Sequence, residues 1–186
     1  MRKETKTVLY QQENAVALLT INRPTVLNAL NRQVFHDLES LFDQIAVDES
    51  VGAVVITGAG EKSFVAGADI AEMAQYTPLE ARAFAQQGQR VFSKMEKIPQ
   101  PVIAAIQGYA LGGGCELALA CDIRYGSPKA KLGQPEVNLG VLPGFGGSQR
   151  LPRLIGKGRA SELLLTGDII DSTKPFALAC LTKSSP

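Results

Sequence analysis

Apolar positions along the chain fall into two patterns that alternate. Short apolar runs rich in β-branched residues are typical of buried strands. Three such runs stand at residues 15–21, 51–57 and 102–106. Between them, apolar residues at helical spacing predict amphipathic helices over residues 31–48 and 78–97. The order β-α-β-α-β predicts an α/β fold built on a parallel sheet with helical crossovers.

Shorter segments complete this outline. A short helix is expected to begin near Asp69, whose side chain suits the N-cap position. Asn31 suits the same position at the start of the helix over residues 31–48. In the second half, two short strands and two helices are expected at residues 122–126, 130–133, 146–156 and 158–167. Ligand-binding groups of a parallel sheet lie on the loops that leave the carboxyl ends of its strands. Those loops are residues 58–69 and 107–116.

Composition narrows the class of protein. The 186 residues carry 19 Lys and Arg against 18 Asp and Glu, a net charge of +1, so no nucleic-acid partner is expected. The three cysteines lack paired spacing and His36 is the only histidine, so neither a disulfide scaffold nor a metal site is expected. The first apolar stretch is too short for a signal peptide or membrane span. A cytoplasmic protein with no membrane partner is predicted.

The most informative segment is GYALGGGCELALACDI, residues 108–123. Its consecutive glycines leave backbone N–H groups unshielded at the start of a predicted helix, a place that attracts anions. Such groups can also stabilise an oxyanion that develops on a carbonyl. Glu116 follows in an apolar setting, where an unpaired carboxylate is expensive to bury, which favours a poised acid or base or a helix N-terminal charge. A glycine-rich turn needed only for close packing gives the same pattern, so both interpretations stay open.

A second carboxylate in such a setting is Glu136, within QPEVNLG. Proton transfer without a cofactor commonly uses two carboxylates whose surroundings separate their pKa values, so Glu116 and Glu136 form a candidate acid/base pair. A capping or ion-paired role for Glu136 is the alternative. Two other chemistries are excluded, because GAGEKS (58–63) fits neither nucleotide-loop template and Ser148 lacks the nucleophile elbow of serine hydrolases.

Four segments taken together closely resemble the enoyl-CoA hydratase, or crotonase, family. They are INRPTVLNAL (21–30), SFVAGADIAEM (63–73), PVIAAIQGYALGGGCELALACDI (101–123) and GQPEVNLGVLPGFGGSQRL (133–151). The resemblance covers roughly residues 8–171 in order. It implies the ClpP/crotonase fold, a spiral of repeated ββα units with a perpendicular small sheet, and so refines the parallel-sheet expectation.

The resemblance also implies roles for individual residues. The backbone N–H groups of Ala68 and Gly113 are expected to form the oxyanion hole for a thioester carbonyl. Glu116 and Glu136 match the two glutamates of true hydratases, one or both of which often change in superfamily members that catalyse other reactions. The expected substrate- and CoA-binding residues are Arg23, Val26, Leu27, Ala66, Ala68, Asp69, Ile70 and Gly113.

The implied activity is the reversible syn addition of water to a short-chain trans-2-enoyl-CoA, which yields a 3-hydroxyacyl-CoA in fatty acid metabolism. CoA is part of the acyl-CoA substrate, and no separate cofactor or metal is expected. Members of the family assemble as homotrimers or hexamers. Two alternatives stay open: an enoyl-CoA isomerase of the same superfamily, and an inactive CoA-binding fragment.

The end of the chain departs from the family. Residues 1–171 are predicted to form a crotonase-like catalytic core, and residues 172–186 an aberrant tail. Pro175 falls where the family has a helix interior, at a cost of roughly 3 kcal/mol. Read from the third base of suitable synonymous codons, the tail can spell E-A-L-R-L-G-L-L-N-K-V-V, close to the family helix. We therefore hypothesise a frameshift near codon 172 that removes the helical trimerisation module, which predicts a poorly soluble or inactive chain without family-type assembly.

Overall fold

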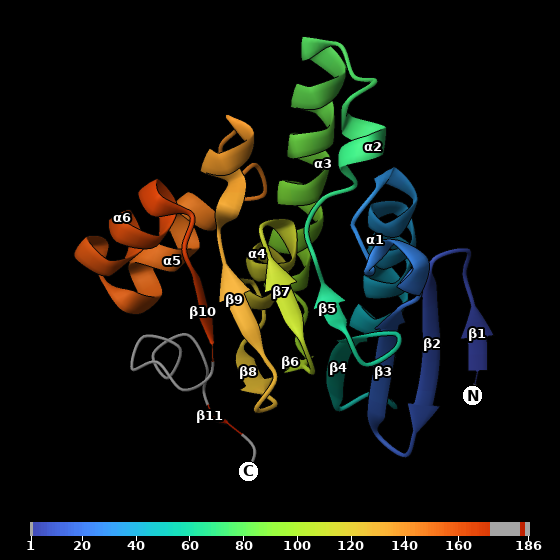
Figure 1. Cartoon of the computed structure of the whole chain (residues 1–186). Coiled ribbons are helices and arrows are strands. Elements are labelled where there is room, and N and C mark those ends of the chain that lie inside the picture. Colours follow the sequence, from blue (N-terminus) through green and yellow to red (C-terminus); the bar gives the residue numbers. More distant parts are fainter. Residues whose placement is uncertain (1, 172–182, 185–186) are drawn as a thin grey trace.

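The computed structural model describes residues 2–171 and 183–184, and it contains two β-sheets with helices packed against them (Figure 1). The larger sheet has the strand order β1-β2-β3-β4-β6-β8-β11. Its strands are β1 (Arg2–Glu4), β2 (Val8–Glu13), β3 (Val16–Ile21), β4 (Ala53–Gly58), β6 (Val102–Ile106), β8 (Ile123–Gly126) and β11 (Lys183–Ser184). From β3 to β8 neighbouring strands run parallel, whereas β1 and β2 extend the sheet in antiparallel pairs.

The smaller sheet has the order β10-β9-β7-β5. Its strands are β5 (Ser63–Val65), β7 (Tyr109–Leu111), β9 (Lys131–Gly133) and β10 (Ile169–Asp171). The successive pairs β4–β5, β6–β7 and β8–β9 each send one strand to the larger sheet and the next to the smaller one. The chain therefore winds as a spiral of repeated units, and the α/β spiral predicted from the sequence is confirmed.

Helices connect and cover these strands. The α-helices are α1 (Arg32–Ala46), α2 (Ile70–Met73), α3 (Pro78–Met95), α4 (Gly113–Leu119), α5 (Gly147–Ile155) and α6 (Lys157–Thr166), and the 3-10 helices are η1 (Pro24–Val26) and η2 (Pro135–Leu139). Helix α1 packs beside α3, and α4 packs between β7 and α5. In Figure 1 strand β7 of the smaller sheet lies in front of α4, and α4 contacts both β7 and β5.

Helix α1 shows how the apolar pattern becomes packing. Asn31 caps the helix, because its side chain accepts a hydrogen bond from the backbone N–H of Val34 at 3.0 Å. The face with helical spacing is buried as predicted, and it includes Val34, Leu38, Leu41, Phe42 and Ile45. Burying each large apolar side chain contributes about 1.5–3 kcal/mol. This face therefore fixes α1 on the sheet.

Strands β1, β2, β5, β7, β10 and β11 were not predicted, and β2 and β5 show the reasons. Strand β2 forms an antiparallel hairpin with β3, so the larger sheet is mixed rather than wholly parallel; adjacent polar residues in VLYQQE hide its alternation. Strand β5 lies where a loop was expected, and it forms through pairing with β7 rather than through local preference. The remaining predicted elements agree with the structure to within one or two residues at each end.

Among the described residues, no helix has the length and apolar character needed to cross a bilayer. These residues also include no group of three or more His, Cys, Asp or Glu placed to hold a metal ion. The tail predicted for residues 172–186 lies outside the described residues, apart from β11, whose backbone pairs in parallel with β8. The division at residue 171 and the frameshift therefore stay hypotheses.

Candidate active site

Glu116 lies in the first turn of α4, two residues after the last of the three glycines. The residue is 1% exposed. Its Oε1 atom accepts two hydrogen bonds, one from the backbone N–H of Phe145 at 2.8 Å and one from that of Gly147 at 2.7 Å. Phe145 lies in the turn that leads into α5, and Gly147 is the first residue of that helix. A distant part of the chain thus fixes the orientation of this carboxyl group.

The surroundings of Glu116 hold its carboxyl group near neutrality. Burial raises the pKa of Glu116 to about 7, and the negative charge of Glu136 acts in the same direction. The N–H groups of Gly147 and Phe145 and the charge of Arg150 oppose this rise because each favours the ionised form. At neutral pH such a group can accept or release a proton.

Glu136 lies in η2 and is 9% exposed. Its carboxylate packs against the first of the three glycines, since a Cβ atom placed on Gly112 would lie 3.1 Å from Oε1 of Glu136. Burial raises the pKa of Glu136, and its own backbone N–H opposes the rise. The two carboxyl groups singled out from the sequence therefore meet at the start of α4, and both have raised pKa values.

The backbones of Ala68 and Gly113 approach each other at the start of α4, next to Gly112. A Cβ atom placed on Gly113 would be 3.4 Å from the backbone nitrogen of Ala68. Leu30 bonds to the carbonyl of Gly67 and the N–H of Asp69 in a parallel bridge, so the N–H of Ala68 points away from Leu30. Within the described residues, neither Ala68 nor Gly113 has a partner for its N–H. Two N–H groups without partners therefore belong to residues that lie close together, and their joint role as an oxyanion hole stays a prediction.

The glycine segment serves packing and leaves donors free at the same time. A Cβ atom on Gly114 would lie 1.9 Å from the carbonyl oxygen of Val65, so only glycine lets α4 approach β5 this closely. That approach brings Gly113 to Ala68. Close packing and free N–H donors, the two interpretations left open from the sequence, therefore both apply, the first to Gly114 and the second to Gly113.

The comparison with known families agrees with this geometry. The family model described as "Enoyl-CoA hydratase/isomerase" matches residues 11–174. The chain belongs to the enoyl-CoA hydratase/isomerase family. It is 48% identical over 180 residues to a short-chain-enoyl-CoA hydratase of Clostridium acetobutylicum, covering 97% of this chain and 69% of that relative. It is also 48% identical over 176 residues to a crotonyl-CoA hydratase of Syntrophomonas wolfei, covering 95% of this chain and 68% of the relative.

Solved structures of this family share the fold. An enoyl-CoA hydratase of Bacillus anthracis superposes with a TM-score of 0.94 at 39% identity, covering 97% of this chain and 70% of that chain. Another, from Geobacillus kaustophilus, has a TM-score of 0.95 at 30% identity, covering 100% of this chain and 70% of that one. The resemblance inferred from four sequence segments is confirmed.

The expected CoA-binding residues of this hydratase/isomerase family member cluster as predicted, although their contact with CoA stays a prediction. The N–H of Ala66 donates to the carbonyl of Leu27 at 3.0 Å, which brings the N-terminal turn to the AGADI segment. Leu27 is 39% and Ile70 57% exposed, and Val26 is also exposed. These apolar side chains are therefore accessible to a ligand.

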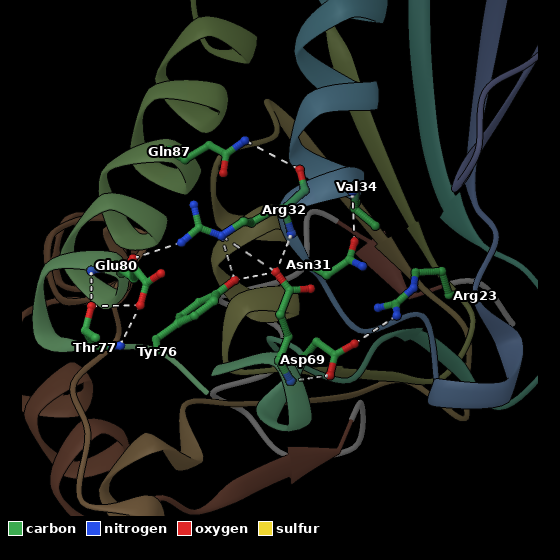
Figure 2. Close-up of polar contacts among 10 residues, drawn as sticks. Arg23, Asn31, Arg32, Val34, Asp69, Tyr76, Thr77, Glu80 and Gln87 are labelled. Atoms are coloured by element: carbon green, nitrogen blue, oxygen red, sulfur yellow. Dashed lines mark hydrogen bonds and ion pairs between the residues drawn. The ribbon is translucent and has the colours of Figure 1, made fainter. Parts of the chain in front are cut away.

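Arg23 and Asp69 bind each other. Their side chains form an ion pair at 2.8 Å (Figure 2). Arg23 also donates to the carbonyl of Ala29 at 2.6 Å. Asp69 accepts the N–H of Glu72 at 3.2 Å, so the predicted N-cap of α2 is confirmed. Burial alone would raise the pKa of Asp69, but the hydrogen bonds and charge of Arg23 and the backbone N–H donors lower it overall. The pair fixes the segment that carries Ala68.

Sequence reasoning missed a second group that holds this segment. Arg32 of α1 donates through Nε to the hydroxyl of Tyr76 at 2.9 Å, and its guanidinium lies 4.6 Å from the centre of the Tyr76 ring. The Tyr76 hydroxyl in turn donates to Glu72 of α2. In Figure 2 the Arg32 side chain reaches both Tyr76 and Glu80, and Glu80 forms a capping box with Thr77 at the start of α3. The T-P-L-E pattern was the available signal for that helix start.

The residues that hold Glu116 were also missed. Phe145 and Gly147 supply the donors, and Arg150 acts on the carboxyl group through its charge. Nothing local in the sequence marks them, because each acts through a backbone group or across a tertiary contact.

Proposed function

We propose that this chain is an enoyl-CoA hydratase, which adds water reversibly and in syn fashion to a short-chain trans-2-enoyl-CoA to give a 3-hydroxyacyl-CoA. The observation that carries the proposal is the meeting of two buried carboxyl groups with raised pKa values beside two unpartnered backbone N–H groups. The names of the relatives from Clostridium acetobutylicum and Syntrophomonas wolfei support the short-chain substrate class.

The N–H groups of Ala68 and Gly113 receive the thioester carbonyl oxygen. When water attacks C3, the electron pair of the C2–C3 double bond moves toward the thioester, and negative charge builds on its oxygen. Preorganised backbone donors stabilise such charge more in the transition state than in the ground state. Removing one donor of this type costs about 100- to 1,000-fold in rate.

The two carboxyl groups supply the proton transfers. Glu116 accepts a proton from the attacking water, whose oxygen bonds to C3, and Glu136 delivers a proton to C2. Both groups hold the same water, so protons exchange within the pair, and the pair titrates as one coupled unit. Because the carbonyl is polarised by N–H groups and the protons move between carboxyls, this mechanism uses no cofactor beyond the CoA of the substrate.

The decisive assay is hydration of crotonyl-CoA by the purified chain, followed by the loss of enoyl-thioester absorbance and by product analysis in deuterated water. The proposal predicts a 3-hydroxyacyl-CoA with one deuterium at C2. Conversion of a 3-enoyl-CoA to the 2-enoyl isomer without hydration would identify an isomerase instead. Binding of acyl-CoA without any turnover would identify a CoA-binding fragment.

The assay is run on the 186-residue chain and on a version with the reading frame restored after codon 171. We call the form that hydrates crotonyl-CoA the parent chain. Hydration by the restored form alone supports both the proposed site and the frameshift hypothesis. Hydration by the 186-residue chain overturns its predicted inactivity, and hydration by neither form refutes the proposed function.

A further inference from the structure

The turn that holds Glu116 is itself fixed through Phe145. The ring of Phe145 is buried among three other phenylalanines, Phe35, Phe84 and Phe92, at centroid distances of 5.0, 5.4 and 5.9 Å. Its N–H donates to Glu116, and its carbonyl oxygen accepts a hydrogen bond from Nη1 of Arg150 at 2.8 Å. The backbone of one residue therefore links Arg150 to the Glu116 carboxyl group.

Arg150 is held in a single orientation. Its Nε and Nη2 atoms donate to the two oxygens of Glu96, each at 2.7 Å, while Nη1 donates to Phe145. Glu96 caps the carboxyl end of α3, and only 16% of the Arg150 side chain is exposed. A fork of this kind fixes geometry as well as adding energy. Arg150 thus joins α3, α5 and the turn between residues 142 and 147.

Gly146 records how closely the guanidinium lies against this turn. Its φ is +101°, which favours glycine, and a Cβ atom at this position would lie 2.4 Å from Nη1 of Arg150. The backbone of the turn rests directly on the guanidinium. Movement of Arg150 therefore moves the N–H donors on both sides of Gly146.

We infer that Arg150 is a positioning residue for Glu116: held by Glu96, it fixes the Phe145–Gly147 turn and so the orientation of the carboxyl group. This inference rests on the proposed role of Glu116 in hydration. A surface ion pair with no connection to the site would contribute little to the reaction. Here the arginine of the Glu96–Arg150 pair also binds the carbonyl of Phe145, whose N–H binds the carboxyl group of Glu116.

The protonation of Glu116 provides a readout that a purely structural role would not move. Among the described residues, the charged groups with the largest effect on this carboxyl are Glu136 from η2 and Arg150 from α5, and the turn contributes the N–H groups of Phe145 and Gly147. Loss of the Arg150 charge raises the pKa of Glu116. Loosening of the two donors also raises it, because they bind the ionised form. Both effects move the acid limb of kcat/KM to higher pH.

The test compares Arg150→Gln and Arg150→Lys with Arg153→Gln as the matched control, since Arg153 is an exposed arginine of α5 that binds Gln149 of its own helix. Arg150→Gln is expected to lower kcat by about 10- to 100-fold with KM little changed, the size expected when a reacting group is misplaced. Its acid limb is expected at higher pH. Arg150→Lys keeps the charge but cannot span three acceptors, so kcat is expected to fall about tenfold or more with a smaller shift of the limb.

Full activity of Arg150→Lys would overturn the inference, since charge alone would then suffice. Parent values of kcat and of the acid limb in Arg150→Gln would overturn it as well. Circular dichroism checks that each variant folds. If the Arg150 variants do not, Glu96→Gln carries the test: it loosens the far end of the fork, so reduced kcat supports the inference and parent kcat contradicts it.

Titrating Glu116 in the absence of turnover distinguishes failure of this inference from failure of the proposed function. The infrared band of its protonated carboxyl, assigned by its loss in Glu116→Gln, is followed against pH in each variant. If neither form of the chain hydrates crotonyl-CoA, the proposed function fails. The inference still stands if the band titrates at higher pH in Arg150→Lys, which keeps the charge, but not in Arg153→Gln, and it falls if Arg150→Lys titrates as the parent chain does.

Discussion

Gly147 is the position where the smallest change should disturb the proposed chemistry most directly. Its N–H binds Oε1 of Glu116 at 2.7 Å. In Gly147→Ala, the added Cβ would lie 2.9 Å from Cγ of Glu116 and 2.9 Å from Nε2 of Gln134. Carbon atoms at optimal separation are about 3.5–4.0 Å apart, so the carboxyl group, the amide or the turn must move by more than half an ångström, roughly the difference between these distances.

The size of the effect follows from this crowding. Inserting one methyl group into a packed interior costs about 1–3 kcal/mol of stability, which leaves the chain folded if its stability is typical of a domain. Displacement of a reacting group by about 1 Å can cost 100-fold in rate. We therefore expect Gly147→Ala to lower kcat for crotonyl-CoA hydration by about 10- to 100-fold, with a modest fall in thermal stability.

The assay measures kcat and KM by the loss of crotonyl-CoA absorbance, with thermal unfolding measured in parallel. Gly144→Ala is the matched control, because the same methyl group would meet only Cβ of Ala85 at 3.7 Å and the carbonyl of Leu142 at 3.9 Å. The control should keep the parent kcat. A Gly147→Ala variant that hydrates at the parent rate would refute the claim that this turn determines the position of Glu116.

Three further predictions concern charge, capping and substrate binding. The pKa of Glu116 rises from an ordinary value of 4.5 to about 7 in the folded chain, so the folded state binds the proton more tightly than the unfolded state does. The resulting contribution to stability is present below pH 4.5 and is lost as the pH rises through 7, a loss of about 3 kcal/mol that Glu116→Gln should abolish in urea titrations. Parallel pH profiles of variant and parent would contradict the assignment. Asp69→Ala removes the N-cap of α2 and the partner of Arg23, so the free energy of unfolding should fall by about 1–2 kcal/mol, whereas replacement of exposed Asp168 by alanine should change it by less than about 0.5 kcal/mol. Ile70→Ser should raise KM for crotonyl-CoA about fivefold without changing kcat, because it removes apolar surface that binds substrate and transition state alike. Leu79→Ser, at an exposed position on α3, is the control. An unchanged KM in Ile70→Ser would remove Ile70 from the CoA-binding group.

Features marked by local pattern were predictable. The helix α1 was visible because its apolar residues recur at helical spacing behind an asparagine cap. Glu116 and Glu136 stood out because burying a carboxylate in apolar surroundings costs free energy unless the group is paired or hydrogen-bonded. The glycines ahead of Glu116 indicated a helix start with free N–H groups, and the structure brings one of them to Ala68.

Features made by tertiary contact were not predictable from local pattern. The ion pair between Glu96 and Arg150 joins residues 54 positions apart, and charged residues at the ends of helices are too common to mark it. Phe145 looked like one more apolar residue in a glycine-rich turn, although both of its backbone polar groups hold other residues in place. Strand β5 exists only through its partner β7.

The central claim is that Glu116 and Glu136 act together on one water molecule. The most direct measurement is the rate of crotonyl-CoA hydration by Glu116→Gln, Glu136→Gln and the double variant, each compared with the parent chain. The account predicts that each single variant loses about 100- to 10,000-fold in kcat. It also predicts that the kcat of the double variant is about that of the less active single variant, because the two residues act as a unit. Hydration at the parent rate by either single variant would contradict it.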